Sequence, residues 1–231
     1  MYKINFVLIF VFCTLKLEAQ NVTSFQLLKK YFIEGDWVWM SPVLIVFIFG
    51  LAFCIERIIT LNLATIDTDK FLSNIDLNLK NNSIDKAMQY SKNVPGPAAS
   101  IIHEGLKNIG KGPENVEKAI INYGSVQMGL MEKGLVWISL FISLAPMLGF
   151  LGTVVGMIQA FEKIEAAGDL SPSIVAGGIK VALLTTVFGL IVAMVLQVFY
   201  NYIVSKINSL TNDMEDTSIQ FMDILHENKL I

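Results

Sequence analysis

Residues 134–161 decide the fold, and they read GLVWISLFISLAPMLGFLGTVVGMIQAF. None of them carries a charge, and Lys133 and Glu162 bound the stretch. A helix rises about 1.5 Å per residue, so about 20 apolar residues cross a hydrocarbon core about 30 Å thick. We therefore predict a transmembrane helix here that is longer than one crossing requires, so that it tilts or projects beyond the bilayer.

Two further stretches, Trp37–Ile55 and Val181–Ser205, also lack charge and are long enough to cross a membrane. Trp37 and Trp39 stand at the start of the first of them, where interfacial aromatic residues are expected. The sequence thus predicts three transmembrane helices, which we place at 41–60, 134–161 and 174–205.

The composition agrees with a membrane protein. Hydrophobic residues make up 54% of the chain and charged residues 16%, whereas soluble domains are about 25% charged. The net charge of −3 does not indicate a nucleic-acid partner. The fold class we expect is an all-α membrane protein with a helical cytoplasmic domain. Its spans are expected to contact membrane lipid.

The residue types that carry chemistry are scarce. Cys13, Cys54, His103 and His226 are too few and too scattered for a disulfide framework or a metal site. The segment Gly110–Gly112 is too short for a phosphate-binding loop. The residues themselves therefore predict no metal site and no nucleotide-binding loop.

The first residues have the pattern of a secretory signal peptide. A basic start at Lys3 precedes the apolar run Ile4–Leu15, and Leu17–Ala19 offers a small residue for cleavage. We expect residues 1–19 to be removed, with an uncleaved signal anchor as the alternative. Either way, residues 20–40 form a periplasmic segment before the first span.

The basic residues set the orientation. Nine of the 17 lysines and arginines lie within 57–133, so the positive-inside rule places that region in the cytoplasm. It follows that 61–133 is a cytoplasmic domain, 162–173 a periplasmic hairpin and 206–231 a cytoplasmic tail. We expect a multi-pass protein of the bacterial inner membrane, with a periplasmic N-terminus.

The cytoplasmic region has a helical pattern. Residues 62–93 lack proline, and Ser83 can cap a helix over Ile84–Lys92. Another helix is predicted over Ala98–Asn108, with Ile101, Ile102 and Leu106 on one side. A third can begin at Pro113 and run without further proline into the second span.

Small residues recur along the second and third spans. Gly149, Gly152 and Gly156 share a helix face with Thr153, and Ala182, Thr185, Thr186, Gly189 and Ala193 have similar spacing. Small residues let helices approach closely in lipid. The alternative is that Thr153 and Thr186 point into a polar lumen, while Pro146 kinks the second helix.

The spans contain no aspartate, glutamate or histidine within their charge-free cores. A proton relay in a membrane usually needs an ionisable group at depth. If ions cross here, the titrating carboxylate should belong to another subunit. Lys180 can snorkel to the periplasmic surface, or face the lumen and bias a partner's carboxylate.

At this point the chain resembles the MotA/TolQ/ExbB proton-channel family. The string Ala145–Phe161, APMLGFLGTVVGMIQAF, is similar to the family motif APLLGLLGTVxGMIxAF, and Gly178–Leu190 is similar to its third-helix motif. Glu56-Arg57 resembles the pair that ends the family's first helix. The resemblance covers roughly residues 25–225 and is closest to ExbB.

The resemblance implies a homopentamer whose second and third helices line a central pore. Two copies of a single-span ExbD-, TolR- or MotB-like partner stand in that pore, and the partner's membrane aspartate carries the proton. Thr153, Thr186 and Thr185 would then line the ion pathway. The pore face would also carry Pro146, Gly149, Gly152, Gly156 and Gly189.

By the same resemblance, we expect a subunit of a motor driven by the proton motive force that energises TonB-dependent transport through a TonB-like protein. Such a subunit makes and breaks no chemical bond, so the resemblance implies no catalytic residues, no cofactor and not an enzyme. Some ExbB-like members carry a glutamate near the position of Lys180, and its absence weakens the Ton-type assignment. The alternatives are a TolQ-like or gliding-type envelope motor, or a non-conducting scaffold for a periplasm-reaching partner. The choice between H⁺ and Na⁺ stays open.

Overall fold

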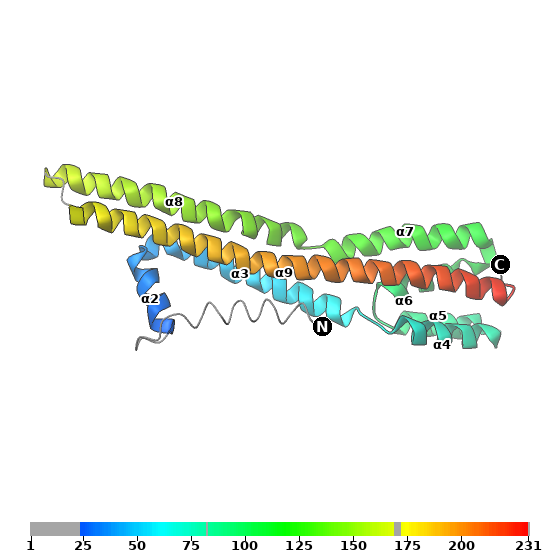
Figure 1. Cartoon of the computed structure of the whole chain (residues 1–231). Coiled ribbons are helices and arrows are strands. Elements are labelled where there is room, and N and C mark those ends of the chain that lie inside the picture. The colour runs from blue at the N-terminus through cyan, green and yellow to red at the C-terminus, as the bar shows by residue number, and fades with distance from the viewer. Residues whose placement is uncertain (1–23, 82, 169–171, 231) are drawn as a thin grey trace. The chain divides into compact units, whose positions relative to one another are not determined.

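The computed structural model describes residues 24–81, 83–168 and 172–230, and the expected signal peptide lies outside them. Within these ranges all regular elements are helices, as predicted (Figure 1). They are α2 (Ser24–Glu34), α3 (Trp37–Leu63), α4 (Thr68–Lys80), α5 (Ile84–Asn93), α6 (Pro97–Lys107), the 3-10 turn η1 (Ile109–Lys111), α7 (Pro113–Glu132), α8 (Leu135–Ala167) and α9 (Pro172–Glu227).

Three helical stretches among the described residues are long and apolar enough to cross a membrane, which confirms the predicted number. They contain α3, α8 and α9, and the expected spans fall on these helices. Pro42 lies in the second turn of α3 and Pro146 in the interior of α8. Each proline removes one backbone donor from its helix.

The helix that begins at Pro113 does not run uninterrupted into the second span. Its start is confirmed, but α7 ends at Glu132 and α8 begins at Leu135. Gly134 between them has a φ of 89°, a left-handed conformation that glycine adopts at little cost. The segment after Pro113 contains no further proline, but Gly134 breaks the helix before the second span.

The chain divides into two compact units, which we describe separately. The first contains the chain up to Pro42 together with Leu148–Phe188. In it, α2 packs on the N-terminal part of α9, where the rings of Phe32 and Phe188 meet edge to face at 6.0 Å. The α8 and α9 segments of this unit also pack on each other.

The second unit contains Val43–Met147 and the chain from Gly189 onward. Its core includes Ile101, Ile102 and Leu106 of α6, the three residues predicted to share one side of this helix, and all three are buried. Phe221 of α9 is also fully buried, and a Cβ on Gly105 would lie 2.9 Å from its ring. Gly105 thus makes room for a large side chain.

The part of α9 beyond the third predicted span continues this core. Between Ile203 and Leu225, the buried residues recur every three or four positions: Ile203, Ile207, Leu210, Met214, Thr217, Phe221 and Leu225. This spacing keeps one face of the helix against the protein. Beyond its end, the Asn228 amide donates to Asp76 of α4 at 3.0 Å.

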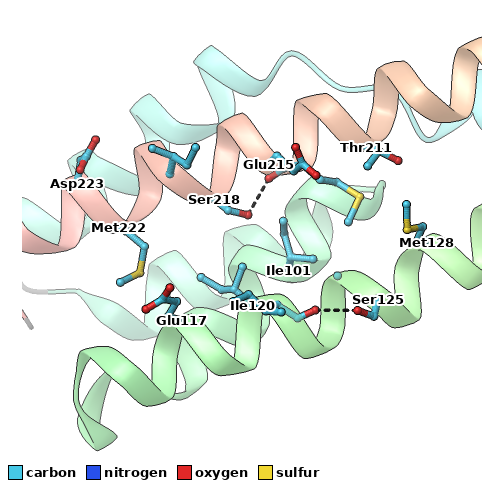
Figure 2. A pocket seen from close by; sticks show the side chains of 14 residues that line it. Ile101, Glu117, Ile120, Ser125, Met128, Thr211, Glu215, Ser218, Met222 and Asp223 are labelled. Carbon is cyan, nitrogen blue, oxygen red and sulfur yellow. Dashed lines mark hydrogen bonds between the residues drawn. The ribbon is translucent and has the colours of Figure 1, made fainter.

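A cleft of about 710 Å³ lies between α7 and α9 in the second unit (Figure 2). Ile101 and Ile120 line it together with Met214, and Ile121 and Ile219 at its edge are largely exposed. An open apolar surface of this kind therefore lies beside the core of the second unit.

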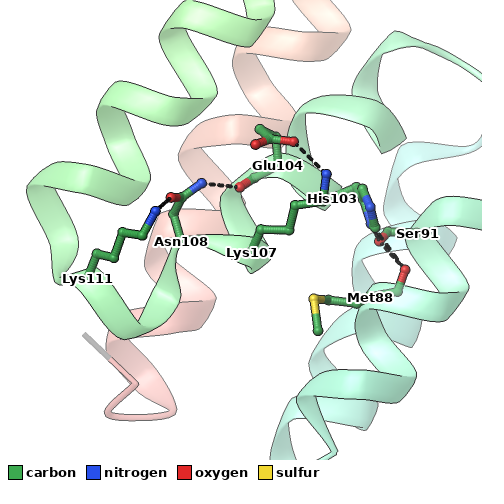
Figure 3. A network of polar contacts seen from close by, with 7 residues as sticks. All are labelled: Met88, Ser91, His103, Glu104, Lys107, Asn108 and Lys111. Atoms are coloured by element: carbon green, nitrogen blue, oxygen red, sulfur yellow. Dashed lines mark hydrogen bonds and ion pairs between the residues drawn. The ribbon is translucent and has the colours of Figure 1, made fainter.

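A polar network joins α5 to α6 near the same core (Figure 3). The His103 ring nitrogen Nδ1 lies 2.9 Å from the Ser91 hydroxyl and 3.1 Å from the Met88 carbonyl. Lys107 pairs with Glu104 at 2.9 Å. Ser91 is buried, so these contacts satisfy a hydroxyl that would otherwise be costly to bury.

Candidate functional site

The α8–α9 contact in the first unit is built from small residues at three levels. A Cβ on Gly152 would lie 2.8 Å from the Cβ of Thr185, so no larger residue fits there without a shift. The backbone of Ala182 lies against Gly156, and a Cβ on Gly178 would overlap Ala160. The two helix backbones therefore approach closely, as small residues allow in lipid.

Two of the candidate threonines lie in this contact. Thr185 is 1% exposed, and its hydroxyl donates to the Ala182 carbonyl at 2.8 Å. The Thr186 hydroxyl donates across to the Gly149 carbonyl of α8 at 3.3 Å. The structure thus brings Thr185 to Gly152 and Thr186 to Gly149, and the second pairing links the helices by a hydrogen bond.

The other candidate residues lie apart from these hydrogen bonds. Thr153 is half-buried, and its hydroxyl donates within α8 to the Phe150 carbonyl at 2.6 Å. Pro146 is half-buried in α8, and Gly189 is buried in α9. Every candidate hydroxyl donates to a carbonyl, and each keeps oxygen lone pairs that can accept a hydrogen bond.

Lys180 has a partner that the sequence analysis did not identify. Its ammonium lies 2.9 Å from the Glu34 carboxylate, which also lies 4.0 Å from Lys30. The Lys180 side chain is 55% exposed and that of Glu34 is 29% exposed. This pairing ties the end of α2 to the start of α9.

The pairing belongs to a longer contact. Lys180, Leu184 and Phe188 recur every four residues on one face of α9, and they meet Glu34, Gly35 and Phe32 respectively. The contact with α8 uses Gly178, Ala182 and Thr185, which lie on a different face of α9. The N-terminal part of α9 is therefore held from two sides in this unit.

Comparison with known proteins agrees with this architecture. The family model described as the MotA/TolQ/ExbB proton channel family matches residues 93–216, more than half of the chain. That range includes α7, α8 and most of α9. It therefore covers the small-residue contact and all the candidate threonines.

Individual relatives carry the names ExbB and TolQ. The biopolymer transport protein ExbB homolog of Methanothermobacter thermautotrophicus is 31% identical over 169 residues, which are 73% of this chain and 60% of that protein. ExbB of Aquifex aeolicus is 35% identical over 37% of this chain and 57% of its own length. The Tol-Pal system protein TolQ of Haemophilus influenzae is 30% identical over 42% of each chain.

These matches span less than two thirds of each of those three relatives. Together with the three long apolar helices, the relatives indicate a multi-pass inner-membrane protein. The family model and the named relatives agree with the motif in Ala145–Phe161. This chain belongs to the MotA/TolQ/ExbB proton channel family.

Proposed function

We propose that this chain is an ExbB/TolQ-like, energy-transducing subunit of an inner-membrane motor driven by the proton motive force. The observation that carries the proposal is the hydroxyl-bearing contact between α8 and α9. The charge-free stretches 134–161 and 181–205 meet there, and the Thr186 hydroxyl donates to the Gly149 carbonyl across the contact. A polar group between apolar helices in lipid is a candidate for an ion pathway.

The topology in this proposal is the one that the lysines and arginines predict. Segments 61–133 and 206–231 are cytoplasmic, and 20–40 and 162–173 are periplasmic. The spans then lie at 41–60, 134–161 and 174–205 in the helices α3, α8 and α9. Residues 1–19 are a signal peptide in this proposal.

A partner supplies the titrating group. The second and third spans contain no carboxylate or imidazole in their charge-free cores, so this chain offers no proton carrier at depth there. We infer a single-span ExbD- or TolR-like partner with a membrane aspartate, standing in a homopentamer of this chain. Moving one charge through a membrane potential releases about 2.3 kcal/mol per 100 mV.

The threonines would solvate the ion beside that aspartate. A hydroxyl can accept one hydrogen bond while it donates another, so Thr186 can remain bonded to Gly149 and still receive a proton donor. Thr153 and Thr185 would extend the path along the same pair of helices. In this proposal the motor energises TonB-dependent outer-membrane transport.

Replacing Thr186 by valine tests the proposal, because valine keeps the shape and loses the hydroxyl. The full chain and its partner are reconstituted in proteoliposomes, and proton flux is followed with a pH-sensitive dye. We expect T186V to abolish partner-dependent flux, while native mass spectrometry still finds a homopentamer. The matched control is Ser143→Ala in α8, whose hydroxyl donates only within its helix. Unchanged flux in T186V would refute the lumen role.

A non-conducting scaffold is the second candidate. It is favoured by the hydroxyls of Thr153 and Thr185, which donate within their own helices, as threonines do in purely structural positions. A scaffold should tolerate valine at Thr153 and at Thr186, with the partner retained during purification. A stable monomer or dimer by native mass spectrometry would favour this candidate over the motor.

A further inference from the structure

The cleft between α7 and α9 exposes large apolar side chains in a region that we propose to lie in water. Ile121 and Ile219 at its edge are 59% and 63% exposed, and Ile120 and Met214 form its buried side. Exposed apolar side chains beside a concave surface commonly mark a binding site. The cleft lies entirely within the second unit.

Its charged lining residues all have one sign. Glu117 of α7 and Glu215 and Asp223 of α9 line the cleft, and no lysine or arginine does so among the described residues. None of these three carboxylates pairs with a cation in the described part of the chain, whereas Glu104 and Glu114 pair with lysines. The negative charge along the cleft is therefore uncompensated within the unit.

Methionine contributes to the apolar surface from both helices. Met128 comes from α7 and Met222 from α9 (Figure 2). Met214 of α9 also lines the cleft. Methionine is flexible and polarisable, so a groove rich in it adapts to the side chains of an incoming helix. Between Glu117 and Met128 the lined part of α7 is about three helical turns long.

We propose that this α7–α9 cleft is a docking site for a lysine- or arginine-rich amphipathic helix of a partner protein. The apolar face of that helix would lie against Ile121, Met214 and Ile219, and its basic residues would pair with Glu117, Glu215 and Asp223. A two-fold contact with a second copy would bring the same carboxylates together, and juxtaposed like charges oppose association. A neighbour in the proposed homopentamer would instead set a different surface of this chain against the cleft. The proposal does not depend on ion conduction.

A peptide-binding experiment tests the proposal. The full chain in phosphatidylcholine nanodiscs is titrated into a fluorescein-labelled 14-residue helical peptide of leucine and lysine, and anisotropy is measured at low salt. Empty nanodiscs report binding to lipid alone, and a peptide with glutamate in place of lysine reports the charge requirement. We expect saturable binding of the basic peptide that exceeds its binding to empty nanodiscs, and no such excess for the acidic peptide.

Two sets of variants then locate the site. Binding of the basic peptide should weaken about tenfold in the triple variant E117Q/E215Q/D223N, which removes the carboxylates of the cleft. The control variant E132Q/D216N/E227Q removes the same number of negative charges outside the cleft and should bind the peptide as the unaltered chain does. Ile121→Ser with Ile219→Ser should also weaken binding. The matched apolar control is Val126→Ser with Leu130→Ser, since these residues are exposed but do not line the cleft.

Three outcomes would overturn the proposal. The peptide could bind no better than to empty nanodiscs, or the cleft variants and their controls could bind it equally. The third is rapid disulfide formation between copies that carry Ile219→Cys in a Cys54→Ala background, because it would assign the cleft to a second copy of this chain.

Discussion

The contact of α9 with α8 in the first unit and the packing around Phe221 in the second are built from residues of different size. In the first unit its contact with α8 uses Gly152, Gly156 and Ala182, and the backbones come close because little side chain lies between them. In the second unit α9 inserts Phe221 against Gly105, and a Cβ on Gly105 would also meet Ile120. One helix thus turns small residues toward α8 in its N-terminal part and a large apolar ring toward α6 further on.

The difference follows from the solvent proposed for each part. Lipid tails are as apolar as a leucine side chain, so burying leucine against another helix gains little there, and close backbone packing with interhelical hydrogen bonds must provide the attraction. In water the burial of large apolar side chains is itself favourable. The contrast is the one expected if α9 leaves the membrane near Ser205, as proposed, and changes in each contact can test it.

The largest effect is expected in the core of the second unit. Phe221→Ala removes a fully buried ring and leaves a cavity, which costs about 3–5 kcal/mol of stability. Hydrogen exchange of α6 and α7 amides in the reconstituted chain should rise accordingly. The control Ile219→Ala changes an exposed residue of the same helix and should have little effect. Equal exchange in both variants would show that Phe221 does not support this core.

The next effect concerns the small-residue contact. Gly152→Ala places a methyl group 2.8 Å from the Cβ of Thr185, and such overpacking costs about 1–3 kcal/mol. We expect a lower midpoint of thermal unfolding in detergent. Gly177→Ala is the matched control, because a Cβ there meets open space and alanine favours a helix by up to about 1 kcal/mol. A G152A variant as stable as G177A would contradict the close α8–α9 contact.

A smaller effect is expected from the ion pair between Glu34 and Lys180. Both side chains reach solvent, so the coupling in a cycle of Glu34→Gln and Lys180→Gln should be about 0.2–1 kcal/mol. Hydrogen exchange of the α2 amides measures it. The control Lys30→Gln removes a contact of 4.0 Å that is more exposed. A coupling energy of zero would show that the ion pair does not attach α2 to α9. The contact between Phe32 and Phe188 would then have to do so.

The smallest effect is a pH dependence at the end of α9. The Lys80 ammonium, and after it the Asn228 amide, hold the pKa of Asp76 below its usual value near 3.8. Because the folded pKa is lowered, the stabilisation is present above the unfolded value and is lost as the pH falls through the folded one. Exchange of the amides near Asn228, measured relative to their intrinsic exchange rate at each pH, should therefore rise below about pH 4.

In Asp76→Asn this acid-dependent rise should disappear. Asp69→Asn on the same helix is the control and should leave the rise in place, because Asp69 pairs with no lysine or arginine in the described part of the chain. The contact between α4 and the end of α9 would need another explanation if both variants kept the pH dependence.

Patterns within a single helix were the most predictable from sequence. Charge-free length predicted three candidate spans, and Pro113 predicted the start of α7. Spacing placed Ile101, Ile102 and Leu106 on one side of a helix, and all three are buried. The helix α5 begins after Ser83, but the serine hydroxyl makes no capping bond to it and donates to Asn81 instead. The start of α5 was therefore predictable from the sequence, but the capping bond expected to cause it is not formed.

Features that depend on distant residues were missed. Glu34 and Lys180 are far apart in sequence, and neither has a local signal that names the other. The Gly134 break needs a positive φ, which a lone glycine permits but does not dictate. By contrast, the apolar spacing from Ile203 to Leu225 was present in the sequence, and it would have predicted that α9 continues beyond Ser205.

The glycine and alanine contact between α8 and α9 also has a thermal consequence. In the proposed membrane span its attraction would not come from removing apolar surface from water, so its disruption should carry only a small change in heat capacity. The core around Phe221, in the proposed cytoplasmic region, would bury apolar surface from water, and its disruption should carry a large positive change in heat capacity. On cooling, the hydrophobic stabilisation of the Phe221 core should therefore weaken. The stabilisation of the Gly152 contact should change little. Low temperature should loosen this protein first in the unit that contains Phe221.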